Sequence, residues 1–268
     1  MIRMLDRTWA CLRAALLSIG PLLVTPSVLS AQDVEPVPSV QGWDTTSVYD
    51  PVRERRIPIA IMRPTHPAEV PCPVVLISHG YNASAPGTYL LFRGIAQGLT
   101  DAGFAVVSVQ LELPGDTPLP LRGDPRTVRR PIWDRGVQDL LAVSQALVVQ
   151  EPTWALDKVD LIGHSNGGDI SMLLAQEHPE VVHTAVSMDN LRMPLPRTAV
   201  PRIVSLRAED TTADPGVLPT AEEQRTFGIE VITMLGFKHV HFNDRASPAQ
   251  RQELVRVLVE VLREGTVR

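Results

Sequence analysis

The sequence has few cysteines and no excess of charge of one sign. Two cysteines, Cys11 and Cys72, occur in 268 residues, so a framework of disulfide bonds cannot hold the chain together. The formal net charge is −5 and the isoelectric point is about 5.8, which argues against a general nucleic-acid binder. Hydrophobic residues make up 44% and charged residues 21% of the chain. This ordinary globular mixture excludes a disordered, collagen-like or coiled-coil protein.

A long hydrophobic run is also lacking, although the N-terminal segment resembles a secretory signal peptide. Arg3, Arg7 and Arg13 give a positive start, and the apolar residues 14–24 follow. This run is shorter than the roughly 20 residues that a membrane span requires. We therefore expect cleavage near Ala31, a secreted or periplasmic protein, and no stable membrane association after cleavage. A retained N-terminal anchor is the alternative.

Residues 32–268 are predicted to form a single α/β domain. Short continuous apolar runs, typical of buried parallel strands, alternate with segments of helical spacing. The expected strands are 57–63, 74–78, 104–111, 159–163, 182–188, 202–206 and 229–235, and the expected helices are 89–101, 133–149, 166–178 and 248–264. An edge hairpin is expected within 33–56 and a long irregular loop over 113–131. This alternation predicts a mostly parallel central sheet with helices on both faces.

The strongest chemical signal is the pentapeptide Gly163-His164-Ser165-Asn166-Gly167, a G-x-S-x-G motif between a buried strand and a helix. Such a turn exposes the serine oxygen above the sheet. Glycines on both sides remove the β-carbons that would clash in it. The backbone N–H of Asn166, at the start of the helix, can then face a developing negative charge on an oxygen. The motif predicts Ser165 as a nucleophile.

A serine hydroxyl needs a base before it can act as a nucleophile. In this architecture the acid and then the histidine follow the serine, each after a later strand. Asp210 follows the strand expected at 202–206, and His239 follows the strand expected at 229–235. We predict Asp210 as the acid and His239 as the base. The alternatives are Glu209, Asp214 and Asp189 for the acid, and His241 for the base.

A second oxyanion donor is expected in the loop after the strand at 74–78. The backbone N–H of Tyr81 is the first choice and that of Asn82 is the alternative. His79 and His164 flank this loop and the serine turn, where a histidine more often braces the turn by hydrogen bonding. The histidines lack a metal-ligand spacing such as H-E-x-x-H. We therefore predict no metal, and the expected serine chemistry requires no organic cofactor.

The strand followed by His-Gly, the GHSNGG turn, and the late aspartate and histidine resemble the α/β-hydrolase superfamily over about residues 57–264. Within it, the segments SHGYNASAPGTYLLFRGIAQGL, RRPIWDRGVQDL, GHSNGGD and MDNLRMPLPR resemble secreted bacterial esterase-like proteins, grouped loosely with dienelactone hydrolases and platelet-activating-factor acetylhydrolases. The resemblance implies acyl transfer to water through a serine ester. It implies these roles: Ser165 as nucleophile, Asp210 as acid, His239 as base, and the backbone N–H groups of Tyr81 and Asn166 as oxyanion donors. Dienelactone hydrolases proper use a cysteine nucleophile, so their substrate is not carried over.

The substrate is predicted only by class. No large helical cap is expected between Leu161 and Ile203, which favours a carboxylic ester of small or medium size in an open cleft. A lipase, an amidase and a thioesterase share the same residues and are alternatives. A non-catalytic binding protein with the same fold is an alternative of another class. The arginines in the loop at 113–131 could favour an anionic group, or the loop could be a solvated surface segment.

Overall fold

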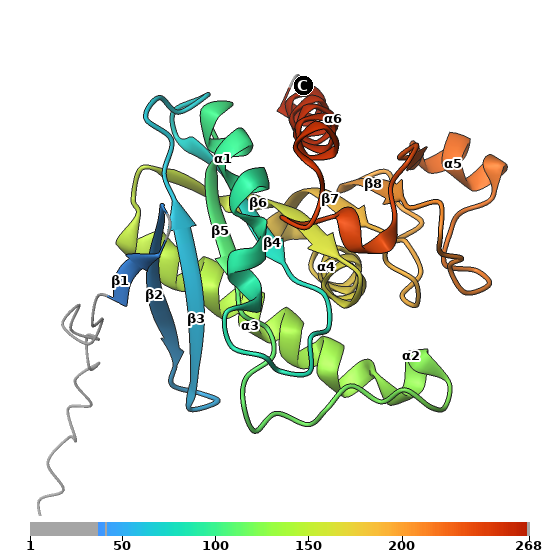
Figure 1. Cartoon of the computed structure of the whole chain (residues 1–268), viewed down its shortest axis with the longest axis horizontal. Coiled ribbons are helices and arrows are strands. Elements are labelled where there is room, and N and C mark those ends of the chain that lie inside the picture. The colour runs from blue at the N-terminus through green and yellow to red at the C-terminus, as the bar shows by residue number, and fades with distance from the viewer. Residues whose placement is uncertain (1–36, 41, 267–268) are drawn as a thin grey trace, which may run out of the picture. The chain divides into compact units, whose positions relative to one another are not determined.

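The structure is a computed structural model, and it describes residues 37–40 and 42–266 (Figure 1). The chain divides into residues 1–33 and residues 34–268, and the described residues all belong to the second unit. The predicted signal peptide, residues 1–31, lies outside the described residues. Both the signal peptide and the division into leader and single domain therefore stay predictions. No helix within the described ranges combines the length and the apolarity needed to cross a bilayer.

Nine strands of the described chain form one sheet in the order β1-β2-β3-β5-β4-β6-β7-β8-β9. The strands are β1 (Val37–Val40), β2 (Trp43–Asp50), β3 (Arg55–Met62), β4 (Cys72–Ser78), β5 (Ala105–Val109), β6 (Trp154–His164), β7 (Val182–Met188), β8 (Arg202–Arg207) and β9 (Glu230–Thr233). Strands β4 to β9 pair in parallel, whereas β1, β2 and β3 pair antiparallel and β3 joins β5 antiparallel. The prediction of a mostly parallel α/β sheet is confirmed.

Helices cover both faces of this sheet (Figure 1). The helical segments are η1 (Thr88–Phe92), α1 (Arg93–Asp101), α2 (Pro125–Val128), α3 (Arg130–Gln150), α4 (Asn166–Glu177), η2 (Pro179–Val181), α5 (Ala221–Phe227), η3 (His239–His241) and α6 (Pro248–Thr266). Buried residues of α3 and α4 pack in one core cluster, and those of α1 and α6 pack in a second. Strand β4 shows why its sequence is continuously apolar. Val74 and Leu76 belong to the first cluster, and Val75 and Ile77 belong to the second.

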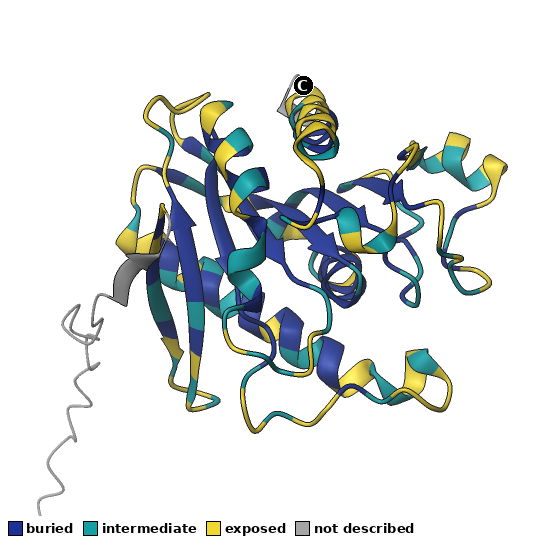
Figure 2. Cartoon of the chain, in the orientation of Figure 1, coloured by how far each residue is buried: buried dark blue, intermediate teal, exposed yellow. Residues whose placement is uncertain are grey.

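Helices α2 and α5, at the periphery of the sheet, were not predicted from the sequence. Helix α5 has no buried residue, so it lacks the apolar periodicity that marks the other helices. Its signal is a capping box, in which the Thr220 side chain accepts from the Glu223 backbone N–H and the Glu223 side chain accepts from the Thr220 N–H. The segment 113–131, predicted as an irregular loop, contains α2 and the first two residues of α3. Figure 2 shows buried central strands, whereas α2 and α5 are largely exposed or intermediate.

The register of the parallel strands aligns the carboxyl ends that carry the candidate site. Ser78 of β4 pairs with Gly163 of β6, and His164 of β6 pairs with Met188 of β7. Because β4, β6 and β7 are neighbours and end at the same level, the residues that follow them meet at one edge of the sheet. In α/β sheets this edge is where ligands bind.

Candidate active site

Ser165 lies on a sharp turn between β6 and α4, with φ at 53° and ψ at −121°. A non-glycine residue in this region is strained and needs support from its surroundings. The Ser165 backbone N–H donates to the Met188 carbonyl at 3.0 Å. A β-carbon on Gly167 would lie 2.4 Å from the carbonyl oxygens of Ser78 and His79, and one on Gly163 would lie 2.3 Å from the Gly167 carbonyl oxygen. The close approach of these backbones therefore explains both glycines of the motif.

His239 comes from η3, after β9, and its ring lies against the Ser165 side chain. The Nε2 atom is 3.0 Å from Ser165 Oγ, and Nδ1 is 2.6 Å from Asp189 Oδ2. Because Nδ1 faces a carboxylate, it carries the proton, and Nε2 is then free to accept the Ser165 hydroxyl proton. The structure thus brings together Ser165 and His239, the pair that the sequence analysis singled out.

The carboxylate at the imidazole is Asp189, and the prediction of Asp210 for this position is corrected. Asp210 Oδ1 accepts the backbone N–H of His239 at 2.7 Å, so it holds the main chain of the histidine rather than its ring. Asp189 directly follows β7, the strand beside the serine-bearing β6. Asp210 follows β8, which lies one strand farther from β6 than β7 does. Neighbouring strands are about 4.8 Å apart.

Buried polar groups hold Asp189 in place. Its side chain has no exposed surface, and Oδ1 accepts from the Arg207 guanidinium at 3.0 Å and from the Ala208 N–H at 3.1 Å. Oδ2 accepts from the Thr211 hydroxyl at 2.6 Å. Burial alone would raise the pKa of Asp189, but the hydrogen bonds from His239 and Thr211 and the Arg207 charge lower it below its usual value. Asp189 therefore stays an anion that can orient the imidazole.

The other predicted alternatives have partners elsewhere. Glu209 Oε2 accepts the Gly236 N–H at 2.8 Å, and Asp214 forms an ion pair with Arg192. The Nδ1 atom of His241 accepts from the Lys238 N–H at 3.2 Å and from the Gln250 side-chain amide at 2.9 Å. These contacts stabilise the loops around the site, and the His239 ring contacts Ser165 and Asp189 instead.

The loop after β4 approaches the serine closely. A β-carbon on Gly80 would lie 3.1 Å from Ser165 Cβ and from His164 Nδ1. Gly80, Tyr81, His164 and Arg245 are among the residues around a cavity of about 60 Å³ here. The backbone N–H of Asn82, the alternative oxyanion donor, is directed to Glu112 Oε2 at 3.3 Å. Asn166 is the first residue of α4, where a backbone N–H has no acceptor within the helix.

Two buried histidines brace the turns on either side of this loop. His79 Nδ1 donates to the Gly80 carbonyl at 2.7 Å, and its Nε2 accepts from the Leu111 N–H at 3.0 Å. His164 Nε2 donates to the His239 carbonyl at 2.9 Å, which ties the serine turn to the histidine loop. Burial lowers the pKa of His79 to about 4 and that of His164 to about 3. Both rings are therefore neutral structural groups near pH 7.

The buried His79 ring predicts a pH-dependent contribution to stability. Its pKa is about 4 in the folded chain and about 6.5 in an unfolded one. Above pH 6.5 both states are neutral, whereas between pH 6.5 and 4 only the unfolded chain takes up the proton, so stability falls as the pH falls. At pH 5 this effect costs about 2 kcal/mol.

Urea unfolding of the wild type and of His79→Gln at pH 7.5 and pH 5.0 measures the contribution of His79 to the free energy of unfolding. The glutamine does not titrate and can still accept the Leu111 N–H. The stability advantage of the wild type over this variant should shrink by about 2 kcal/mol at the lower pH. His66→Gln, at an exposed position, is the matched control and should show no such change. An advantage that is the same at both pH values would contradict the prediction.

A serine on a strained strand-to-helix turn, at the carboxyl edge of a parallel sheet, is the arrangement of the α/β-hydrolase class. The model of the alpha/beta hydrolase fold family matches residues 73–216, more than half of the chain. The chain belongs to this family. No curated protein sequence matches it.

Several solved structures share this fold with the chain. Est1E from Butyrivibrio proteoclasticus is 11% identical, with a TM-score of 0.56 over 84% of this chain and 99% of that one. A dienelactone hydrolase from Anabaena variabilis is 18% identical, with a TM-score of 0.54 over 82% and 96% of the two chains. Thermogutta terrifontis esterase 2, phosphoramylated by tabun, is 15% identical, with a TM-score of 0.59 over 84% and 96%. At these identities the similarity establishes the fold.

Proposed function

We propose that the protein is a serine hydrolase that cleaves a carboxylic ester of small or medium size through an acyl-serine intermediate. The observation that carries the proposal is the hydrogen-bonded series from Ser165 Oγ through the His239 ring to Asp189. Nucleophile, base and orienting acid in this geometry are the requirements for acyl transfer. Thermogutta terrifontis esterase 2, one of the structures of similar fold, supports an ester as the substrate.

The reaction follows from these positions. His239 Nε2 takes the hydroxyl proton as Ser165 Oγ attacks the carbonyl carbon, and Asp189 stabilises the resulting imidazolium. The backbone N–H groups of Tyr81 and Asn166 are assigned to the oxyanion, each worth about 3 kcal/mol in comparable enzymes. His239 then gives its proton to the leaving alcohol. Water attacks the acyl-serine by the same route in reverse, and no metal or organic cofactor takes part in the proposed steps.

The surroundings of the site support a small or medium ester. Between Ser165 and the start of β8, the helical segments of the described chain are α4 and the short η2. Neither of them is an inserted cap, which favours an open cleft over a deep channel for a long acyl chain. A lipase, an amidase and a thioesterase remain alternatives with the same three side chains.

Three of the four arginines of the segment 113–131 give little support to an anionic substrate. Arg126 donates to the Pro215 carbonyl at 2.7 Å, and Arg129 donates to the Pro120 carbonyl at 3.2 Å. Arg130 pairs with Asp134 and Glu177. These guanidinium groups hold α2 and α3 against neighbouring segments, and the proposed ester therefore carries no required charge.

Labelling with a fluorophosphonate probe tests the proposal. The phosphorus probe reacts with a serine whose proton is removed by a base, so we expect one adduct, on Ser165, in the folded protein. The adduct is located by peptide mass and should be absent after heat unfolding. The same sample should hydrolyse p-nitrophenyl acetate. A folded protein without adduct and without turnover would favour the alternative of a non-catalytic binding protein with this fold.

We also propose that the protein acts outside the cytoplasm, as a secreted or periplasmic enzyme. The sequence of residues 1–31 supports this location through its positive start, apolar stretch and small residues before the expected cleavage at Ala31.

A further inference from the structure

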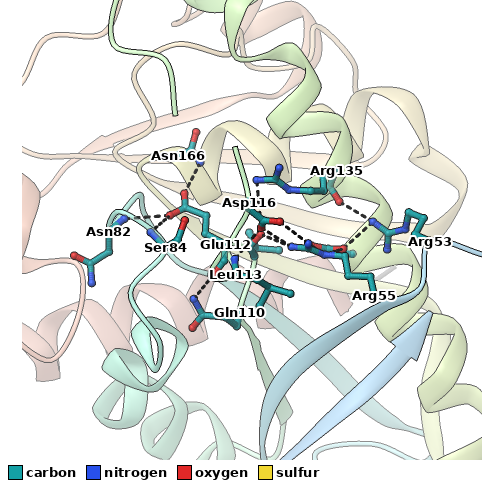
Figure 3. A network of polar contacts seen from close by, with 12 residues as sticks. Arg53, Arg55, Asn82, Ser84, Gln110, Glu112, Leu113, Asp116, Arg135 and Asn166 are labelled. Atoms are coloured by element: carbon teal, nitrogen blue, oxygen red, sulfur yellow. Dashed lines mark hydrogen bonds and ion pairs between the residues drawn. The ribbon is translucent and has the colours of Figure 1, made fainter. Parts of the chain in front are cut away.

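A buried carboxylate beneath the active-site edge has no part in the proposed steps. Glu112 follows β5 and is 3% exposed. Figure 3 shows its side chain between the loop at 82–84 and Asn166, with Asp116, Arg55 and Arg135 farther along the same polar network. A buried carboxylate is costly unless each oxygen has partners, so its contacts reveal what it holds.

Every side-chain contact that the structure gives Glu112 is with a donor. Oε2 accepts from the backbone N–H groups of Asn82 at 3.3 Å and Ser84 at 3.4 Å. Oε1 accepts from the side-chain amide of Asn166 at 3.4 Å. One carboxylate thus joins the loop directly after Tyr81 to the first residue of α4. Tyr81 and Asn166 carry the backbone N–H groups assigned to the oxyanion.

The orientation of the Asn166 side-chain amide requires Glu112 to be a hydrogen-bond acceptor. The indole N–H of Trp133 donates to Asn166 Oδ1 at 3.0 Å, so the amide must direct its NH₂ group toward Glu112. Donors therefore face Glu112 from both sides. An ionised carboxylate accepts on both oxygens, whereas an isosteric amide offers an acceptor on only one side.

The loop needs this support because its backbone is strained. Ala83 and Ser84 have φ angles of 51° and 57°, a left-handed conformation that costs a residue with a side chain about 1 kcal/mol or more. Gln110 donates from its side-chain amide to the Ala85 carbonyl at 3.3 Å and to the Glu112 carbonyl at 2.7 Å. The loop is thus held from below by residues that follow β5.

The charge state of Glu112 depends on the same contacts. Burial raises the pKa of Glu112, while the N–H groups of Asn82 and Ser84 and the charge of Arg135 oppose the increase, and Asp116 adds to it. The donors that the carboxylate holds therefore also favour its ionised form.

We propose that Glu112 is a positioning residue for the oxyanion hole, because its carboxylate ties the loop after Tyr81 to Asn166 and keeps the two backbone N–H donors in register. This inference rests on the proposed function. Its consequence is specific: losing the tie should weaken stabilisation of the transition state more than binding of the ground-state ester.

Glu112→Gln tests the tie, because the variant has the same shape but must turn an NH₂ group toward one set of donors. With p-nitrophenyl acetate we expect kcat to fall about 10- to 100-fold, as for a misplaced oxyanion donor, while KM changes less than about threefold. Affinity for a trifluoromethyl ketone, whose serine adduct carries the oxyanion, should fall by the same factor as kcat/KM. Asp116→Asn is the matched control.

Asp116 binds Arg55 at 2.7 Å and the Leu113 N–H at 2.8 Å, outside the loop at 82–84. Its amide variant should lower the melting temperature but leave kcat within about threefold of the wild type. If Glu112→Gln does not fold, Asn166→Ala removes the other end of the tie while keeping the Asn166 backbone N–H, and it should lower kcat and ketone affinity together.

The outcomes separate this inference from the proposed function. A folded Glu112→Gln with wild-type kcat and ketone affinity would overturn the inference and leave the enzyme a serine hydrolase. A higher KM with unchanged kcat would overturn it too, since the loop would then shape the substrate pocket only. A wild type without turnover or serine labelling would remove the proposed function itself, before any variant is compared.

Discussion

Replacing Ser165 with alanine should lower kcat for p-nitrophenyl esters by about 10⁴- to 10⁶-fold, the loss seen when a serine nucleophile is removed. The side chain contributes its Oγ to the bond with His239, while its backbone bond to Met188 does not depend on the hydroxyl. We therefore expect the melting temperature to change by less than about 2 °C. Initial-rate kinetics and thermal unfolding on the same sample measure both effects.

Ser171→Ala is the matched control for this substitution. Ser171 lies on the same helix, α4, and its buried hydroxyl has no hydrogen-bond partner among the described residues. Removing it should leave turnover unchanged, with a stability equal to or above that of the wild type. Turnover by Ser165→Ala within tenfold of the wild type would end the assignment of Ser165 as the nucleophile.

The second large effect is expected at the carboxylate that faces the imidazole. Asp189→Asn should lower kcat by about 10⁴-fold, because an amide can hold the wrong tautomer of His239 and cannot stabilise its cation. Asp210→Asn should stay within about tenfold of the wild type, since an amide oxygen can still accept the His239 backbone N–H. The two variants make the same chemical change on either side of one histidine.

Stability must be measured beside these rates. Asp189→Asn leaves the Arg207 guanidinium, which is 6% exposed, without its charged partner, and losing one member of a buried pair costs about 3–5 kcal/mol. Rates are therefore compared at a temperature where circular dichroism shows both variants folded. A larger loss of kcat in Asp210→Asn than in Asp189→Asn would return the acid role to Asp210.

The fold was predictable from the sequence wherever a buried element shows a local pattern of apolar residues. Strand β4 directs apolar side chains to both faces of the sheet, so its sequence is a continuous apolar run. The predicted strand over residues 182–188 coincides with β7. Helix α5 was missed because no residue of it is buried, so its seven residues carry no periodic apolar signal. Apolar patterns of this kind indicate which residues face a core, but they do not predict elements that caps and ion pairs hold at the surface.

The serine turn was likewise predictable, because steric crowding in the turn requires residues without a β-carbon. Gly167 lies where a β-carbon would collide with the backbone at the end of β4. A steric requirement of this kind is visible in the sequence as a motif of neighbouring residues. His239 could be ranked above His241 from its position after the last strand. The structure then places His239 against the serine and His241 on the Lys238 N–H.

The sequence by itself determined the class of fold and the serine turn and pointed to His239, whereas only the tertiary structure decided which carboxylate faces the imidazole. Asp189 and Asp210 both follow strands, so local pattern cannot separate them. What separates them is that β7 is the neighbour of β6, and that the histidine loop returns over the edge with its ring toward Asp189 and its backbone toward Asp210. Glu112 became significant for the same reason. Its role depends on contacts with residues 30 and 54 positions away, which no local pattern encodes.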